Sequence, residues 1–333
     1  MEKGWRGLPY HSVSEHFKRI FSQKVYKIPV SVVDDCPNRM GLKGMQTCSF
    51  CDVWGSAARE ESFTLDLNSQ ILKYRETIAK RYKAENFLVY FQAYTNTFTK
   101  ASQLRENFDT ALAHSFVRGL VIGTRPDCLS EAVLQLWQEY CLKTHVGVEL
   151  GVQSFYDEHL KYMRRGHSAE DSLKAIKRIA ERTSVDLGIH LIFGSPSETM
   201  SEVRETARIC NDLPITNVKL HNLHVLKNTP LAEWYAQGEF TPLSFEQYRD
   251  RVAEFLSHLH PRIAVHRLLA YAPRWEELIA PDWTADKMGP HQKIVDHLRA
   301  QKIYQGCNIS DQTPEDRQLF HQMSLRVERT NGI

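Results

Sequence analysis

The sequence predicts an α/β fold with a parallel sheet wound toward a barrel, followed by a C-terminal extension. Short runs rich in β-branched and aromatic residues alternate about six times with segments of helical apolar spacing. Such alternation is typical of parallel α/β proteins. Small and polar residues follow nearly every run, which favours a barrel over a doubly wound sheet, because barrel enzymes build their sites there. The expected strands cover 27–33, 87–92, 119–123, 145–151, 186–194 and 217–223.

These runs are nearly continuous in apolar residues, which is typical of parallel strands that are covered on both faces. The segments between them predict amphipathic helices. One begins at Ser168, where Asp171 three residues later is typical of a capping box. Its apolar residues are expected to share one buried face, namely Leu173, Ile176, Ile179 and Ala180. Further helices are expected over 66–83, 130–141, 199–211 and 244–258.

Composition limits the class of protein. The 333 residues include 42 Lys+Arg and 40 Asp+Glu, so the formal charge is +2, with 42% apolar and 25% charged residues. These values are ordinary for globular proteins and exclude disordered, collagen-like and disulfide-dense chains. The change in character after Leu226 leads us to divide the chain into an N-terminal segment (1–24), a barrel core (25–229) and a C-terminal extension (230–333).

No segment of the sequence is expected to enter a membrane. The first twenty residues lack the apolar core of a secretion signal, and no run of about 18 apolar residues occurs. Seven cysteines without a signal indicate free thiols or metal ligands rather than disulfides. We therefore expect a cytoplasmic protein.

Three of the cysteines, Cys36, Cys48 and Cys51, stand in a loop directly after the first strand, with the spacing C-x11-C-x2-C. Thiolates bind soft metals, which here means zinc or an iron–sulfur cluster. Three unrelated free cysteines and a structural zinc site remain alternatives, but zinc normally takes four closed ligands and no fourth is evident. A [4Fe–4S] cluster held by three cysteines leaves one iron open for another ligand, which suits this loop.

The loop also carries an aromatic residue, Phe50, directly before its last cysteine, and with this feature it resembles the radical S-adenosylmethionine (SAM) superfamily. The usual spacing in that superfamily is C-x3-C-x2-C, and the longer gap resembles the catalytic subunit of Elongator. More closely, the chain resembles the YhcC-like family from about residue 25 to residue 306. The resemblance rests on DDCPNR (34–39), YFQAYTNTF (90–98), GTRPDC (123–128), ELGVQS (149–154), RRGH (164–167), IHLIFGSPSET (189–199) and KLHNLHVLKNTPLA (219–232).

The resemblance implies a partial (β/α)6 radical SAM barrel, similar to a TIM barrel, with one [4Fe–4S] cluster. Cys36, Cys48 and Cys51 would bind three irons, and the amino and carboxylate groups of SAM would chelate the fourth. An electron donor such as flavodoxin or ferredoxin would allow cleavage of SAM to a 5′-deoxyadenosyl radical, which abstracts hydrogen from a substrate. The protein would orient the cofactors and exclude water.

The same resemblance implies which residues contact SAM. The strand-end segment 92–97 stands where the family binds the methionyl amino group, although it lacks the usual Gly-Gly-Glu and also reads as an ordinary capped turn. Arg165 suits a carboxylate because its fork can hold both oxygens, but it also lies in a basic run that could be solvated. The expected contacts are Gln92, Tyr94, Thr124, Gln153, Arg165 and Gly194, the last in a turn near the adenine.

Three histidines are harder to assign from the sequence. His190 stands where some members of the family carry an acidic ribose contact, and a core position is the alternative. His221 and His224 follow the sixth strand, where they could form a metal pair or face a substrate. In the extension, His266, Arg267 and Arg274 are the first candidates for substrate contact.

The substrate is the least determined part of the prediction. The resemblance to the Elongator subunit implies RNA, with the wobble uridine of tRNA as the sharpest hypothesis. A radical enzyme that acts on a small molecule or a protein would keep the cluster but bind no RNA in a salt-dependent way. A non-catalytic zinc-binding module is a third alternative, which would not explain the strand-end motifs.

Overall fold

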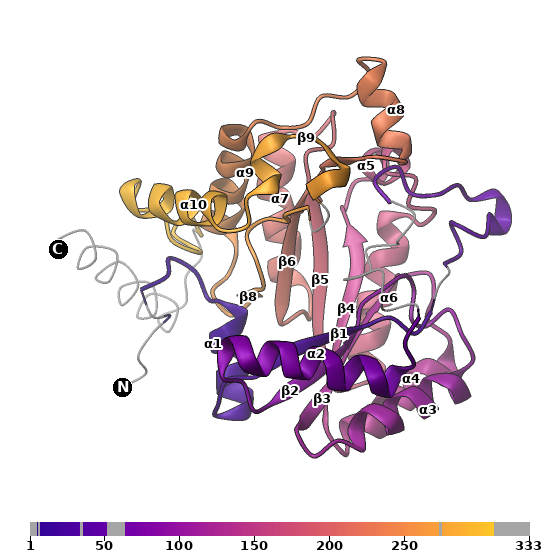
Figure 1. Ribbon diagram of the computed structural model, residues 1–333. Coiled ribbons are helices and arrows are strands. Elements are labelled where there is room, and N and C mark those ends of the chain that lie inside the picture. The colour runs from indigo at the N-terminus through magenta and orange to yellow at the C-terminus, as the bar shows by residue number, and fades with distance from the viewer. Residues whose placement is uncertain (1–4, 6, 34–35, 52–63, 273–274, 310–333) are drawn as a thin grey trace.

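The architecture is a curled, seven-stranded parallel sheet with helices around its outside (Figure 1). The computed structural model describes residues 5, 7–33, 36–51, 64–272 and 275–309. The strands are ordered β1-β2-β3-β4-β5-β6-β8, so β1 and β8 are the two edges and the barrel stays partial. Their bounds are β1 Tyr26–Val30, β2 Phe87–Phe91, β3 Val117–Thr124, β4 His145–Gln153, β5 Asp186–Phe193, β6 Asn217–Asn222 and β8 Ala264–Val265. The predicted fold class is confirmed.

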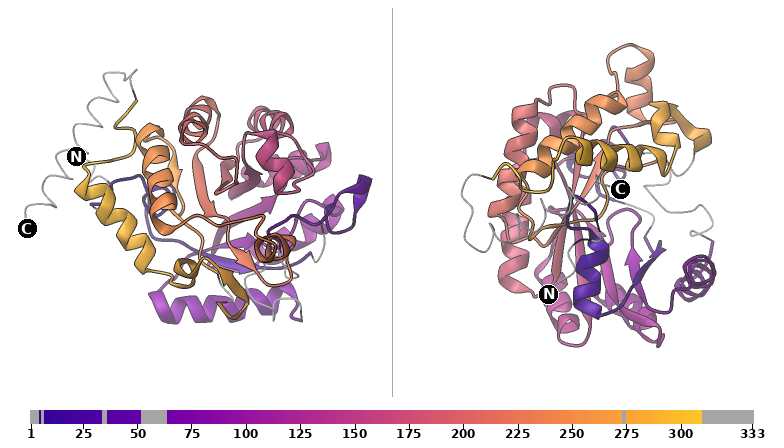
Figure 2. Two further views of the ribbon diagram at one scale, coloured as in Figure 1. Left: turned by 90° about the horizontal axis from the view of Figure 1, so that it is seen from above. Right: turned by 90° about the vertical axis from the view of Figure 1, so that its left-hand side faces the viewer.

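Each of the predicted helices is present and is capped at its start. Ser168, Thr199 and Ser244 each complete a capping box, which satisfies backbone N–H groups that the helix itself leaves unpaired. Viewed from above, the helices surround the sheet (Figure 2). The helices predicted from the sequence are α2 Leu67–Tyr82, α4 Glu131–Cys141, α6 Ala169–Arg182, α7 Met200–Asp212 and α9 Phe245–His258.

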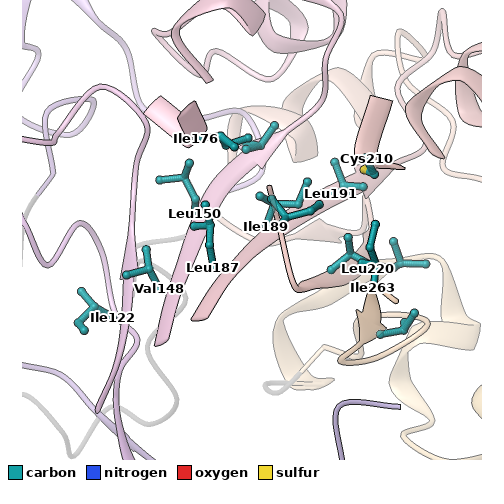
Figure 3. Packing of buried hydrophobic residues seen from close by; sticks show 14 of the residues in the cluster. Ile122, Val148, Leu150, Ile176, Leu187, Ile189, Leu191, Cys210, Leu220 and Ile263 are labelled. Atoms are coloured by element: carbon teal, nitrogen blue, oxygen red, sulfur yellow. The ribbon is translucent and has the colours of Figure 1, made fainter. Parts of the chain in front are cut away.

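The central strands β2 to β5 are buried almost throughout, as expected of strands covered on both faces, but the two faces differ in chemistry. Successive residues of a strand point to opposite faces. In β4, Val148 and Leu150 pack in the main core, whereas Glu149 and Gly151 line a cavity. Figure 3 shows the apolar side of β3 to β6, where these residues meet Ile176 of α6 and Cys210 of α7. The sheet is therefore apolar outside and largely polar inside.

The expected buried face of α6 is partly wrong. Ile176 and Ile179 are buried as predicted, but Leu173 and Ala180 are exposed. Ser172 and Ala175 occupy the buried positions instead, because residues 172, 175, 176 and 179 have the i, i+3, i+4, i+7 spacing of one helix face, to which positions 173 and 180 do not belong.

Several elements lie outside the predictions. The short strand β8 extends the sheet beyond β6, and β7 (Val225–Leu226) pairs antiparallel with β9 (Leu278–Ala280). These three strands have only two or three residues each, which is too short to show a periodic pattern. The helices that were not predicted are α1 Val13–Phe21, α3 Ala101–Leu112, α5 Asp157–Tyr162, α8 Pro230–Ala236 and α10 Gly289–Ala300.

Helix α1 covers the inner face of the sheet at the amino ends of its strands. Phe17 packs there against Leu88, Tyr90 and Val121. The segment before α1 joins the sheet edge, because the Val265 N–H donates to the carbonyl of His11 at 2.7 Å. The interior of the partial barrel is thus closed on its amino side.

The two ends of the described chain meet at Gln305, whose side chain is fully buried. Its Oε1 accepts from the N–H of His11 at 2.9 Å, and its Nε2 donates to the carbonyls of His260 and Ile263. No helix among the described residues is long and apolar enough to span a membrane. The division of the chain at 24/25 and 229/230 stays a prediction.

Candidate active site

A cavity of about 460 Å³ opens at the carboxyl ends of the strands and reaches into the partial barrel. It collects nearly all of the predicted cysteine ligands and SAM contacts, which come from five different strand ends and loops. The three loop cysteines line it, as do five predicted SAM contacts, namely Gln92, Tyr94, Thr124, Gln153 and Arg165. Gly194 is not among its lining residues. These positions agree with a shared site, and the role of each residue stays a prediction.

The cysteine loop is held in place by polar contacts with the segment after α5. The side-chain Nδ2 of Asn38 donates to the carbonyls of Gln46 (2.7 Å) and Arg164 (2.6 Å). Arg125, which is buried at the end of β3, donates to Asn38 and to the carbonyl of Arg165. The loop therefore has a defined position above the strand ends.

The three thiols fit a group larger than a single ion. Cys36 and Cys48 are buried, and burial, with the nearby Cys48 and Cys36, raises the pKa of the Cys51 thiol to about 12. All seven cysteines lie in the described part of the chain and none is in a disulfide. No three His, Cys, Asp or Glu side chains in the described ranges converge on one ion position. An iron–sulfur cluster, in which each thiolate binds its own iron, suits such a donor set.

Arg165 lies beside the cysteines with part of its guanidinium unused. Its Nη1 donates to Sγ of Cys48 at 3.2 Å and its Nη2 to the carbonyl of Gly151 at 3.1 Å, while its buried Nε has no partner. Because the side chain is buried, the solvated basic run is wrong for this residue. A guanidinium with a free donor at a cofactor cavity suits a carboxylate.

Gly151 leaves room for the ends of the Gln153 and Arg165 side chains. A Cβ at residue 151 would lie 3.0 Å from Nε2 of Gln153 and 3.3 Å from Nη2 of Arg165, which is tighter than ordinary packing. Gln153 itself adopts a left-handed backbone (φ 69°) where β4 ends in an irregular register with β5. Strain of this kind gathers at functional sites because it aims a side chain that a regular strand could not.

The turn after β2 contains one residue that holds the turn and another that lines the cavity. Asn96 is buried and its Nδ2 donates to the carbonyls of Phe91, Ala93 and Gly123, so it holds the turn and does not face the cavity. Tyr94, in a left-handed conformation (φ 55°), lines the cavity. The hydroxyl of Thr124 is hydrogen-bonded to that of Thr97.

Gly194 begins the turn after β5 and is held from outside the cavity. Its N–H donates to Oε1 of Glu198 at 3.1 Å, and the same oxygen accepts from Nε of Arg251 at 2.6 Å. Burial raises the pKa of Glu198 to about 7, although Arg251 lowers it. Helix α9 thus supports the turn that the sequence predicts near the adenine.

A buried carboxylate, Glu149, is the centre of the inner part of the cavity. Its oxygens accept from Lys27, from the hydroxyl of Tyr90 (2.7 Å), from Lys219 (2.8 Å) and from Nε2 of His190 (2.6 Å). His266 lies 3.6 Å away. Burial alone would raise the pKa of Glu149, but Lys219 and Lys27 hold it well below its usual range.

Farther along the cavity, Arg267 lies against His221, with 2.6 Å between Nη2 and Nδ1. His224 also lines the cavity. Burial and the neighbouring Arg267 lower the pKa of both histidines, to about 4 for His224. Of the three extension residues expected to contact substrate, Arg267 lines the cavity and His266 faces Glu149, whereas Arg274 lies outside the described residues.

The sequence analysis missed Glu149, Lys27, Lys219 and Tyr90 as site residues. A signal for the first three was present, because each is a single charge within an otherwise apolar strand. A charge in such a strand is rarely buried without a partner. One negative and two positive charges on three strands therefore predict that these side chains meet inside the curled sheet.

The fold and the cavity define a parallel partial barrel with a cavity at the carboxyl ends of its strands, which is where barrel enzymes build their sites. The model of the radical SAM superfamily matches residues 30–210, and the model of the Radical_SAM C-terminal domain matches residues 215–300. The chain belongs to the radical SAM superfamily, whose members use a [4Fe–4S] cluster and SAM. This confirms the resemblance that the motifs indicate.

Individual relatives agree with this assignment. The protein YhcC of Escherichia coli K12 is 33% identical over 270 residues, which are 81% of this chain and 85% of that one. The tRNA uridine(34) acetyltransferase of Methanocaldococcus infernus is 33% identical over 132 residues, 38% of this chain and 24% of that one. The structure of Elp3 from the same archaeon, with an N-terminal deletion, is similar in fold: its TM-score is 0.64 at 19% identity, with 84% of this chain and 64% of that chain covered.

Proposed function

We propose that this chain holds a [4Fe–4S] cluster through Cys36, Cys48 and Cys51 and uses it to cleave SAM, so that a hydrogen atom is abstracted from a substrate bound deeper in the partial barrel. One observation carries the proposal: the three cysteines and five predicted SAM contacts line a single cavity that continues past them to a second, polar end. A cavity with two chemically different ends provides for a cofactor and a substrate together.

The protein's own residues would bind and orient the cofactor. Arg165 presents its unused donor to the SAM carboxylate, and Gln153, Thr124, Gln92 and Tyr94 line the walls next to it. The turn at Gly194 would pack near the adenine. When bound, the cofactors supply one-electron cleavage of the sulfonium C–S bond, which yields methionine and the 5′-deoxyadenosyl radical. A flavodoxin or ferredoxin in the cytoplasm is the electron donor in this proposal.

The first candidate for the substrate is the wobble uridine of tRNA. Its support is the similarity of 132 residues of this chain to a tRNA uridine(34) acetyltransferase. In this case the nucleotide would leave its stack and enter the cavity, as enzymes that act on a base require.

The second candidate is a small molecule, and an observation inside the cavity favours it. Arg267 and Asn222 line the part of the cavity next to the carboxyl end of β6, with donors that no described residue uses. A cavity of about 460 Å³ lies within the range of small-molecule sites.

Anaerobic reconstitution tests the proposed chemistry. The full chain is reconstituted with iron and sulfide, reduced with dithionite in the presence of SAM, and assayed for 5′-deoxyadenosine. We expect a brown protein with about four irons per chain, and we expect Cys36→Ala, Cys48→Ala and Cys51→Ala to lose both the cluster and the product.

Cys141→Ala is the matched control, since Cys141 ends α4 and does not line the cavity. It should keep the cluster and the product. A colourless protein that forms no 5′-deoxyadenosine, or cysteine variants that keep full activity, would contradict the proposal.

A further inference from the structure

Arg267 has an unusual environment for a buried arginine. It follows β8, and its backbone is fixed to β6 because the N–H of Leu220 donates to its carbonyl at 3.2 Å. The side chain uses Nε on the carbonyl of Leu220 (3.4 Å) and Nη2 on the ring of His221 (2.6 Å). No carboxylate in the described part of the chain forms an ion pair with it, and its Nη1 has no partner there. A guanidinium carries five N–H donors, so most of its fork is available to a ligand.

Two further polar atoms in the same wall lack partners. Oδ1 of Asn222 accepts from the N–H of Ala270 at 2.9 Å, which fixes the orientation of the amide, and its buried Nδ2 has no partner. Nδ1 of His224 is likewise buried and unpaired. Both residues line the cavity. Buried polar groups without partners are rare and call for a ligand or a structural reason.

The charges around this end favour an anion. Lys27, Lys219 and Arg267 are positive, and Glu149 is the single carboxylate among the described residues that line the cavity. Burial and Lys219 lower the pKa of His190 to about 4, and burial and Arg267 hold that of His221 well below 6.5, so both rings are neutral near pH 7. Glu149 is already shared by two lysines, which leaves the charge of Arg267 without a counter-charge.

We propose that Arg267 and Asn222 form a subsite for the carboxylate or phosphate group of a small organic substrate. An arginine fork holds two oxygens of such a group in one orientation, and the amide of Asn222 adds a donor from the neighbouring strand end. The subsite would anchor the substrate beside the carboxyl end of β6, with its remaining atoms directed toward the cysteines. This inference rests on the proposed function, because it names the substrate class of that site.

Binding of simple anions tests the subsite. The reconstituted full chain with SAM is titrated with acetate, succinate or inorganic phosphate at constant ionic strength, and its thermal midpoint is followed. We expect at least one of these probes to stabilise the protein, with the apparent Kd raised tenfold or more in Arg267→Gln and by a smaller factor in Arg267→Lys. Arg208→Gln, which changes an exposed arginine on α7, should behave as wild type.

Asn222→Asp provides a second variant in case Arg267→Gln does not fold. The aspartate keeps an acceptor for the N–H of Ala270 but places a negative charge in the subsite, so it should abolish anion binding. If none of the probes binds the wild-type chain, or if Arg267→Gln and Asn222→Asp bind as wild type does, the proposal is overturned. It is also overturned if a uridine-containing tRNA anticodon stem-loop binds through Arg267 while the small anions do not.

The assay for 5′-deoxyadenosine on the same samples separates this inference from the proposed function. Cysteine-dependent 5′-deoxyadenosine without anion binding rejects the subsite alone. Anion binding through Arg267 without 5′-deoxyadenosine keeps the subsite and rejects the radical chemistry.

Discussion

Gly151 illustrates how a residue without a side chain can be part of an active site. Its carbonyl accepts from Arg165, and the space above its Cα is filled by the ends of Arg165 and Gln153. The missing Cβ is thus what allows two predicted cofactor contacts to lie on one strand end. The motif ELGVQS carries this requirement in its glycine as well as in its glutamine.

Gly151→Ala is expected to weaken SAM binding while the fold is kept. The new methyl group would displace the Arg165 and Gln153 side chains by a few tenths of an ångström. A tenfold rise in the Kd for SAM corresponds to about 1.4 kcal/mol, and we expect an effect of about that size in equilibrium dialysis with reconstituted protein. Gly147→Ala is the control on the same strand, because its Cβ would meet Val121 at an ordinary 3.4 Å. Equal binding by both variants would contradict this role.

At the scale of the element, the strands and the capped helices were the predictable part of the fold. All six predicted strands and the five predicted helices occur, because each carries its own local pattern or cap. Helix α3 had a usable signal in Leu104, Phe108 and Ala111, but its start at Lys100 has no side-chain cap. The two-residue strands β7 and β8 could not be predicted, since they form only where the rest of the chain provides a partner strand.

The residues of the site divide in the same way. The cysteines and the strand-end residues can be identified in the sequence by their residue type and position. The Glu149 network needed the curvature of the sheet, because its members come from β1, β2, β4, β5 and β6 and no two are near in sequence.

Helix α9 supports the turn after β5 through the ion pair between Arg251 and Glu198. The removal of this ion pair gives a prediction at the scale of the element. Arg251→Met leaves the buried carboxyl of Glu198 with the N–H of Gly194 as its hydrogen-bond donor among the described residues. Because Glu198 can take up a proton, we expect the cost of an unsatisfied buried group, about 1–3 kcal/mol, in urea unfolding. Arg249→Met on the same helix removes only a contact to the exposed Asp250 and should change little. The prediction fails if the two variants lose the same stability.

At the scale of the whole molecule, Glu149 helps to hold the interior of the partial barrel together, as layers of apolar side chains do in a closed barrel. The sheet is open between β1 and β8, and the carboxylate draws Lys27 of β1 and His266 next to β8 toward one point. Polar contacts to Glu149 therefore join the two edges that backbone hydrogen bonds leave apart.

Glu149→Gln is expected to destabilise the protein by about 3 kcal/mol, because it leaves two half-buried lysines without their counter-charge. The pKa of Glu149 lies well below its usual 4.5 in the folded state, so its contribution is present above pH 4.5 and is lost as the pH falls through the folded-state value. Urea unfolding of reconstituted protein should show a constant difference from wild type above about pH 5. That difference should shrink toward pH 4.

Glu139→Gln is the matched control. Its surface carboxylate contacts Arg105 and Lys143, and exposed pairs of this kind contribute little. A Glu149→Gln variant as stable as this control would show that the network does not hold the barrel together.

The contact between Gln305 and His11, residues 294 apart in sequence, has a consequence for the order of folding. Strands β1 to β6 each pair with the strand made just before, so the sheet can grow while the chain is still being synthesised. Phe17 of α1 can pack on β2 and β3 as soon as these strands have formed, but the segment before α1 gains its contacts with β8 and Gln305 only later, and contacts between such distant residues form slowly. The joining of the two ends of the described chain is therefore a late step in folding.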